Sequence, residues 1–483
     1  MIDTEKNKLF IYDCAVRGEL SETLLSDTPI DETINKLPEP SNKRKKVLKL
    51  NLSYDEQYDI PETWRWIKLG LITTFGDGQE KVLPANVETK DVWLLELEDI
   101  EKGGRVLRKR TLANSDTKGD KVVFSKGQLL YSKLRPYLKK NLIADEDGVA
   151  TPELIPVTVL GGVNPYYVLY YLMGNYVSSM IDRRSYGIKM PRVDVNFMIN
   201  LPIPLPPIEE QERIVKKIQA VCEELDSVSS LQQQYANNIT SLNKKILDLA
   251  VRGKLVPQDP NDEPASVLLK KIAEEKQKLI KEGKIKKQKT LPTIPEDEIP
   301  FDIPESWEWV RFSSVMNVVS TGPFGSMLHK SDYVETGIPI VNPVHMVNSK
   351  IVPGVKASVT KETAERLEAY KLHTGDLVLA RRGDIGRSAV VSESEEGWLC
   401  GTGSFFASPS KGINPEYISL MLSSEYAKGI LLGNSVGTTM NNLNQGILNN
   451  FIFPLPPTME QERILNAVQD MDDYLAKIVS INN

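Results

Sequence analysis

Basic and amide side chains gather at two places in each half of this 483-residue chain. Those in the first half are Lys133, Arg135, Lys139, Lys140, Arg183, Arg184, Lys189 and Arg192. Those in the second half are Arg381, Arg382, Arg387, Asn434, Thr438, Thr439, Asn441 and Asn442. Lys and Arg hold phosphate groups, Arg also reads guanine, and Asn reads adenine through two hydrogen bonds. The pattern predicts DNA contacts from both halves, with an ordinary polar loop as the alternative for any single residue.

The residue types that catalysis or metal binding would need are sparse. The only histidines are His329, His345 and His373, and the three cysteines form no C-x-x-C pair. No G-x-x-x-x-G-K-S/T sequence is present, so we expect no P-loop ATPase. The run Asn164-Pro165-Tyr166-Tyr167 is similar to the N-P-P-Y box of amino-methyltransferases, but it lacks the second proline and we interpret it as a helix start. We therefore expect no catalytic residue, no metal site and no cofactor bound by this chain.

Net charge and hydropathy restrict the class of protein further. The formal net charge of −6 argues against a protein that holds nucleic acid by bulk charge alone, although it leaves room for local basic faces. No segment approaches the roughly 18 apolar residues of a membrane span. The N-terminal residues have no apolar signal core, and the widely separated cysteines fit a reducing compartment. We expect a cytoplasmic protein without membrane contact.

Two copies of one module account for most of the chain. The run Pro204–Ile214, P-L-P-P-I-E-E-Q-E-R-I, recurs 250 residues later as Pro454–Ile464, and I-P-E-T-W-R-W-I at 60–67 recurs at 303–310. Between these anchors the copies scarcely match, as expected of two readers built for different ligands. The predicted domains are an N-terminal helix with linker at 1–59, module one at 60–207, a long central helix at 208–255, a basic linker at 256–302, module two at 303–457 and a C-terminal helix at 458–483.

Each proline-rich repeat predicts a helix that packs against another helix. Apolar residues follow Ile214 and Ile464 in steps of 3 and 4, which indicates a coiled-coil seam. Thr458 and Gln461 predict a capping box at the second helix start. The run A-V-R-G-E-L at 15–20 echoes A-V-R-G-K-L at 250–255, so residues of about 4–16 should be helical and continue the C-terminal helix.

Inside the modules the pattern indicates mixed α and β structure. Short strands are expected at 122–124, 129–131, 338–341 and 377–380, and helices at 165–181 and 415–429. The linker carries nine lysines between Lys270 and Lys289, with a helix near 265–282. A solvated face is one interpretation of these lysines, and contact with a DNA backbone is the other.

Two diverged modules, each ending in P-L-P-P-x-x-E-Q-E-R-I and a long helix, resemble the specificity (S) subunit of type I restriction–modification systems. The runs A-V-R-G-K-L-V-P at 250–257 and S-V-G-T-T-M-N-N-L-N at 435–444 strengthen the resemblance. Module one departs from it with S-Y-G-I-K-M at 185–190, so its loop is expected to contact DNA differently. The resemblance implies an α+β fold, with two pseudo-two-fold-related mixed α/β target-recognition domains joined by long antiparallel coiled-coil helices.

The resemblance also implies function and partners. Each domain would read one half of a bipartite, asymmetric site in double-stranded DNA, and the helices would set the half-site separation. Two methyltransferase (M) subunits would bring S-adenosylmethionine, and restriction (R) subunits would bring ATP- and Mg²⁺-dependent translocation and cleavage, so the S subunit itself catalyses nothing. The alternatives are a non-catalytic coiled-coil scaffold that bridges two protein-binding modules, and a methyltransferase in its own right, which the absent motifs oppose.

Overall fold

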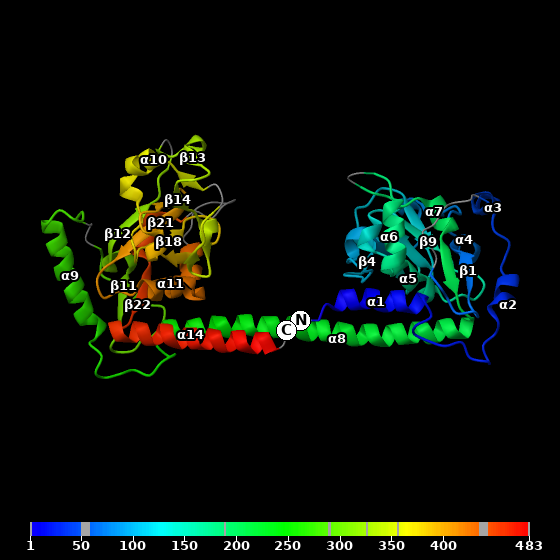
Figure 1. Ribbon diagram of the computed structural model, residues 1–483, viewed down its shortest axis with the longest axis horizontal. Coiled ribbons are helices and arrows are strands. Elements are labelled where there is room, and N and C mark those ends of the chain that lie inside the picture. The colour runs from blue at the N-terminus through cyan, green and yellow to red at the C-terminus, as the bar shows by residue number, and fades with distance from the viewer. Residues whose placement is uncertain are drawn as a thin grey trace. The chain divides into compact units, whose positions relative to one another are not determined.

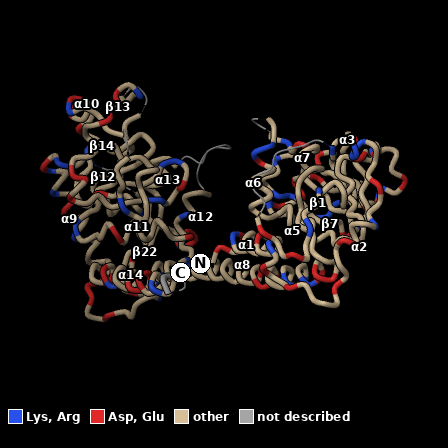
Figure 2. The backbone as a smooth tube through the Cα atoms, turned by 45° about the vertical axis from the view of Figure 1, so that its right-hand side comes forward, with Lys and Arg blue, Asp and Glu red and all other residues tan. Residues whose placement is uncertain are grey.

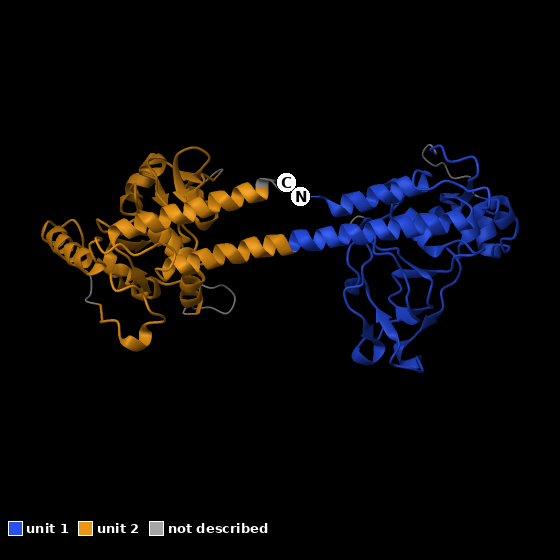
Figure 3. Ribbon diagram, turned by 90° about the horizontal axis from the view of Figure 1, so that it is seen from below, with its two compact units in different colours: residues 1–233 blue, residues 234–483 orange. Residues whose placement is uncertain are grey.

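The computed structural model describes residues 2–49, 58–187, 190–287, 291–324, 327–354, 357–433 and 443–481. These residues form two compact units, 1–233 and 234–483, drawn in two colours in Figure 3. The boundary falls within helix α8 (Ile208–Val251), which contributes residues to both units.

Unit 1 combines helices with three small sheets. Its further helices are α1 (Thr4–Val16), α2 (Ile30–Asn35), α3 (Asn42–Leu48), α4 (Leu69–Ile72), α5 (Pro165–Met173), α6 (Asn175–Arg183) and α7 (Val195–Asn200). Its strands are β1 (Arg65–Lys68), β2 (Lys81–Val82), β3 (Trp93–Leu95), β4 (Arg110–Thr111), β5 (Lys121–Phe124), β6 (Leu129–Ser132), β7 (Leu142–Ile143), β8 (Gly148–Ala150), β9 (Leu154–Val157) and β10 (Pro202–Leu205). The sheet orders are β1-β10, β7-β6-β9 and β2-β5-β8-β3-β4.

Unit 2 repeats this frame with a different interior. Its further helices are α9 (Ala265–Lys281), α10 (Lys361–Arg366), α11 (Pro415–Ser423), α12 (Glu425–Gly433), α13 (Gln445–Asn450) and α14 (Thr458–Ile481). Its strands are β11 (Glu308–Arg311), β12 (Met316–Thr321), β13 (Tyr333–Val334), β14 (Ile338–Val341), β15 (Met346–Val347), β16 (Lys350–Ile351), β17 (Ser358–Val359), β18 (Leu377–Ala380), β19 (Ser388–Val390), β20 (Leu399–Cys400), β21 (Ser404–Pro409) and β22 (Ile452–Leu455). The sheet orders are β11-β22, β12-β21-β18-β19, β13-β17-β14-β20 and β15-β16.

The predicted α+β class and the predicted elements are confirmed. The N-terminal helix, the linker helix and the four predicted strands are present, while each helix expected at 165–181 and 415–429 is a pair broken at Gly174 or Ser424. Asn164 caps α5 by accepting a hydrogen bond from the Tyr166 amide at 2.9 Å, so N-P-Y-Y is a helix start. Trp64 and Trp307 are buried in the cores.

The proline-rich repeats have the same structure in both units. Strands β1 and β11 pair antiparallel with β10 and β22, and the prolines of the repeat end the second strand where α8 or α14 begins. Within each repeat, the first Glu-Gln pair is fully buried. Gln211 accepts a hydrogen bond from the Asn164 amide at 2.9 Å, and Gln461 accepts one from the Asn414 amide at 2.8 Å. The repeat therefore ties each long helix to the start of α5 or α11.

The predicted capping box at Thr458 and Gln461 is wrong. Thr458 is the first residue of α14, and its hydroxyl donates to the Gly412 carbonyl at 3.2 Å. The side chain of Gln461 donates to the Pro456 carbonyl at 3.1 Å as well as accepting from Asn414. Both the oxygen and the nitrogen of this buried side-chain amide therefore have hydrogen-bond partners in the module, as a buried glutamine requires.

The A-V-R-G echo has a steric cause. Gly18 and Gly253 each end a helix with a positive φ, 81° and 65°, which a glycine adopts without strain. A Cβ on either residue would lie 2.5 Å from the Cγ of Pro61 or Pro304. The helix end therefore approaches the module closely in both units, and only glycine allows this approach.

The long helices pair antiparallel with a second helix inside each unit (Figures 1 and 3). In unit 1, Lys8 of α1 bonds Asp226 of α8 at 2.5 Å, while Tyr12, one turn later, meets Cys222, one turn earlier, at 3.6 Å. In unit 2, α14 and the second part of α8 share a core through Ile246, Ile464 and Val468. The predicted seam is not buried throughout, since Leu231 and Leu242 are 63% and 45% exposed.

The basic linker supplies a structural cation as well as a solvated face. The linker lysines that the structure describes are exposed except Lys276 of α9. Its ammonium donates to the carbonyls of Ser313 and Ser314 at 3.0 and 2.7 Å. Arg44 of α3 donates to the corresponding Gly70 carbonyl in unit 1 at 2.9 Å. Burial without a carboxylate lowers the pKa of Lys276 to about 8.

Candidate nucleic-acid interface

One turn occupies the same place in both units and brings the predicted basic clusters together. After β6, the Lys133 amide donates to the Glu153 carbonyl at 3.0 Å, and its carbonyl accepts from the Val193 amide at 2.9 Å. After β18, the Arg381 amide donates to the Gly403 carbonyl at 2.9 Å, and its carbonyl accepts from the Leu443 amide at 3.0 Å. The turn therefore contacts the segment before α7 or α13, where the second predicted cluster ends.

Some predicted DNA contacts in unit 1 have head groups that are already engaged. The ammonium of Lys139 donates to the Met173 carbonyl at 2.7 Å, and burial lowers its pKa. Lys140 donates to the Leu97 carbonyl at 2.7 Å. Two arginines also bond other residues of unit 1. Arg192 donates to both carboxylate oxygens of Glu153 at 2.9 and 3.3 Å, and Arg183 donates to the Ser179 carbonyl at 3.2 Å.

Lys133 and Arg135 stand apart from this group. Neither side chain makes a hydrogen bond or an ion pair with another residue that the structure describes, and Arg135 is exposed. Arg184 is exposed as well, with its guanidinium 5.8 Å from the ring centre of Phe197. The basic residues that flank α6 are drawn in blue in Figure 2.

The turn in unit 2 also carries both an arginine that bonds other residues and an arginine that does not. Arg387 is engaged, since it bonds Asp384 at 3.0 Å and the Pro343 carbonyl at 3.3 Å. Arg382 is exposed and makes no side-chain bond within the described ranges. Arg381 lies over the ring of Phe405 at 5.9 Å, and its Nε is buried without a hydrogen-bond partner among the described residues.

Six predicted contacts lie outside the described residues. They are Lys189, Asn434, Thr438, Thr439, Asn441 and Asn442. Their role in DNA binding stays a prediction.

Two exposed aromatic residues of unit 1 lie among these cations: Tyr186 belongs to the loop at 185–190 that was expected to contact DNA, whereas Tyr137 was not among the predicted contacts. Tyr137 is 47% exposed and Tyr186 is 61% exposed. Tyr186 exchanges two backbone hydrogen bonds with Arg192, at 3.0 and 2.8 Å, which hold it beside the turn. The signal was present in the sequence, because both tyrosines are interleaved with the basic residues from which the interface was predicted.

A further basic run, Arg105–Arg110, has a structural role instead. Arg108 and Arg110 both bond the buried carboxylate of Asp99, at 2.6 and 2.5 Å. Burial by itself raises the pKa of the Asp99 carboxyl, but these two guanidinium groups hold the pKa below its usual value. The run therefore stabilises the sheet around β3 and β4, and local charge alone does not identify the interface.

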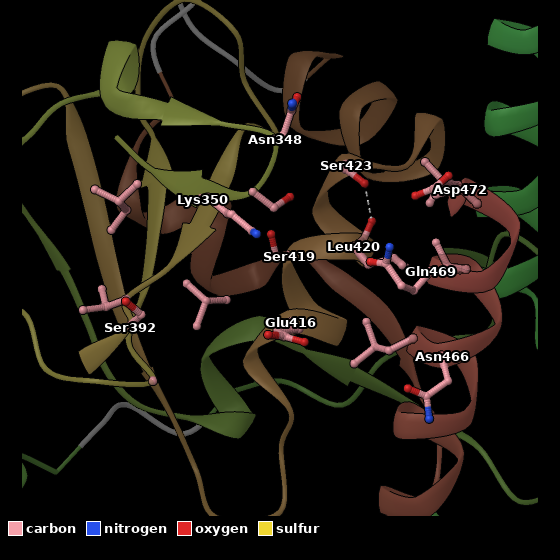
Figure 4. Close-up of a pocket in the computed structure, with 18 of the residues that line it drawn as sticks. Asn348, Lys350, Ser392, Glu416, Ser419, Leu420, Ser423, Asn466, Gln469 and Asp472 are labelled. Carbon is pink, nitrogen blue, oxygen red and sulfur yellow. Dashed lines mark hydrogen bonds between the residues drawn. The ribbon is translucent and has the colours of Figure 1, made fainter. Parts of the chain in front are cut away.

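A groove also recurs at equivalent positions in both units. In unit 1, a cavity of about 1170 Å³ is bounded by α1, α5 and α8, and in unit 2 one of about 1060 Å³ is bounded by α8, α11 and α14 (Figure 4). The equivalent lining residues in order are Tyr166, Leu169, Tyr170, Met173 and Cys222 in unit 1, and Glu416, Ser419, Leu420, Ser423 and Asp472 in unit 2. Tyr12 stacks on Tyr170 at 5.1 Å in the first groove, whereas the second groove has Leu420 at the position of Tyr170.

Metal and membrane features are not apparent in the described part of the chain. It contains no cluster of three or more His, Cys, Asp or Glu residues able to hold a metal ion. None of its helices is long and apolar enough to cross a bilayer. All three cysteines are free.

Comparisons with known proteins agree with this arrangement. The family model of the type I restriction modification DNA specificity domain matches residues 118–234 and 304–482, together more than half of the chain. The type I restriction enzyme EcoEI specificity subunit of Escherichia coli is 27% identical over 550 aligned positions, which cover 96% of this chain and 88% of that protein. The EcoAI specificity subunit of Escherichia coli is 27% identical over 545 positions, which cover 97% and 88%.

A solved structure has the same fold. It comes from work on the structural basis of complex assembly and conformational transition of the type I R-M system. One of its chains superimposes with a TM-score of 0.60 at 19% sequence identity, over 87% of this chain and 93% of that chain.

Proposed function

The chain belongs to the specificity subunits of type I restriction–modification systems, which act in DNA sequence recognition, and we propose that each of its two modules reads one half of a bipartite, asymmetric DNA site. The observation that carries this proposal is the turn after β6 and β18. The same backbone hydrogen bonds hold it in both units. In both it carries cations that no carboxylate among the described residues neutralises, Lys133 and Arg135 or Arg381 and Arg382.

Two different readers follow from the different surroundings of this shared turn. In unit 1 the turn lies beside the exposed Tyr186, and in unit 2 it lies beside the buried Phe405. Phosphate contacts position a protein on a duplex, whereas base contacts specify the sequence. A common frame with different side chains suits two half-sites of different sequence.

Partners would supply the chemistry. We infer that two M subunits bind this chain and bring S-adenosylmethionine, and that R subunits bring ATP- and Mg²⁺-dependent translocation and cleavage. The equivalent position of the two grooves, each beside a helix pair, supports two copies of one partner, while the side chains that line the grooves differ. In Figure 4, Gln469 and Asp472 of α14 lie across this groove from Lys350. The specificity chain contributes recognition and no catalytic residue.

Helix α8 is proposed as the element that sets the number of base pairs between the half-sites. It is continuous for 44 residues and carries the module-anchoring glutamine near one end and Gly253 just beyond the other. A helix has a fixed rise of about 1.5 Å per residue, which suits a spacer.

The test is reconstitution with M subunits and methylation mapping on a random duplex library. We expect methylation of one sequence with two defined segments and a spacer of constant length. Binding of both M subunits without any preferred DNA sequence would instead favour the alternative function, a scaffold that bridges two protein-binding modules.

A further inference from the structure

Arg135 has a backbone conformation that an arginine rarely adopts. Its φ is 50° and its ψ is 61°, in the left-handed region, and the next residue is Pro136. An L side chain is strained there, and a following proline further disfavours helical conformations of either hand. A strained residue of this kind persists only when its surroundings fix it, and such residues cluster at functional sites.

The other positive-φ residues with side chains in the described ranges have local explanations. Asn348 and Ser349 form the two-residue turn between β15 and β16, which requires positive φ at both positions. Lys139, with φ of 50°, has its ammonium bonded to the Met173 carbonyl. The Arg135 side chain has no comparable stabilising contact, because it is exposed and makes no hydrogen bond or ion pair within the described structure.

The neighbouring chain holds Arg135 in place from several directions. Its amide donates to the Pro191 carbonyl at 2.7 Å, and its carbonyl accepts from the Leu138 amide at 2.9 Å. The Ser132 hydroxyl donates to the Leu134 carbonyl at 3.0 Å, and Pro136 is buried. Fold stability alone would favour glycine or asparagine at this position. The arginine is therefore explained by what its side chain does outside the protein.

We propose that Arg135 is the residue with which module one reads a guanine in the major groove of its half-site. This inference rests on the proposed function of the chain in DNA recognition. A guanidinium bonds both O6 and N7 of guanine, and a fixed backbone leaves only the freedom of the side chain itself to be lost on binding. Lys133, on the same turn, contacts the adjacent phosphate, and Tyr186 contacts a neighbouring base.

The test compares Arg135→Gly, Arg135→Ala and Arg135→Lys in the complex with M subunits, with Lys118→Gly as a matched control for an exposed lysine of the same module. Methylation rates are measured on duplexes that vary at each base pair of the first half-site. Both the glycine and the alanine variant should lose roughly 5- to 150-fold discrimination at one G·C pair and keep the second half-site unchanged. The lysine variant should retain part of the discrimination.

Thermal unfolding of the same proteins separates a reading role from a structural one. Arg135→Gly should unfold at a higher temperature than Arg135→Ala, because glycine relieves the strain. A uniform loss of rate on all duplexes, or equal unfolding temperatures for the glycine and alanine variants, would overturn the inference. Failure of the unaltered complex to methylate any preferred sequence would count against the proposed function itself.

Discussion

The indole nitrogen of Trp64 donates a hydrogen bond to Oε2 of Glu210 at 3.1 Å, and Trp307 makes the equivalent bond to Glu460 at 2.8 Å. Each bond joins the residue just before the first strand of a module to the long helix that follows the module. Glu210 also accepts from Ser21 at 2.9 Å, and Glu460 accepts from Gln258, which follow the two A-V-R-G runs. Three segments that repeat in the sequence therefore meet at one buried carboxylate in each unit.

Removal of the indole donor should destabilise the unit that contains it. Trp307→Phe leaves one buried oxygen of Glu460 without its partner, which costs about 1–3 kcal/mol. Chemical denaturation of the variant should show a lower midpoint for unit 2. Trp64→Phe should lower the midpoint for unit 1 by less, because Oε2 of Glu210 keeps a hydrogen bond from the Thr23 hydroxyl. Trp66→Phe is the matched control, because no hydrogen bond is found for the Trp66 indole among the described residues. Equal midpoints for all three variants would refute the role of this bond.

Glu460 should make stability depend on pH. Burial raises its pKa, although Trp307 and Gln258 oppose the rise, so the folded protein binds this proton more tightly than the unfolded chain. The contribution is therefore present at acidic pH and is lost as pH rises from the ordinary glutamate pKa through the raised one. Glu460→Gln should lack this loss. The difference in unfolding free energy between the variant and the parent, measured from pH 4 to 7, should grow with pH, and a flat difference would contradict the assignment.

The free and the engaged lysines should differ in the salt dependence of DNA binding. Lys133→Met should weaken binding to all sequences and reduce the slope of log K against log salt by about 1. Lys140→Met is the control, since its ammonium is bonded to the Leu97 carbonyl. Its slope should be unchanged while its unfolding midpoint falls. The opposite pattern would place the interface elsewhere in unit 1.

The groove in unit 2 should hold one of two M subunits. Gln469 is exposed on α14 in this groove, and Gln469→Trp places a bulky ring in it without removing a described hydrogen bond other than the one to Asp473. Native mass spectrometry should find two M subunits on the parent and one on the variant. Gln469→Ala, which loses the same bond and leaves the groove open, should keep both. Two M subunits on the tryptophan variant would exclude this groove as a docking surface.

Most of the frame was predictable because it repeats. The proline-rich runs predicted the long helices, and the matching runs at 60–67 and 303–310 predicted two modules with a common frame. Gln461 was misassigned to a capping box because its partner, the Asn414 amide, is 47 residues away in the sequence. Leu231 and Leu242 continue the heptad spacing yet stay exposed, since periodicity shows which face can be buried but not where a partner helix lies.

The interface was predictable only as a region. Both basic clusters of unit 1 meet at the turn after β6, but the sequence did not distinguish Lys133 from Lys140. That distinction depends on a carbonyl 43 residues away. The strain at Arg135 is likewise invisible in the sequence, because its φ is set by the Pro191 carbonyl and by the buried ring of Pro136.

The central claim is that each module reads its own half-site, and an exchange of modules tests it most directly. Residues 60–207 are replaced by the corresponding module of another specificity subunit, which leaves Glu210, Gln211 and α8 in place. The exchanged protein is assembled with M subunits, and its methylated sequence is mapped beside that of the parent. We predict that one half of the sequence changes, while the other half and the spacer length stay the same. A change in both halves, or in neither, would contradict the account.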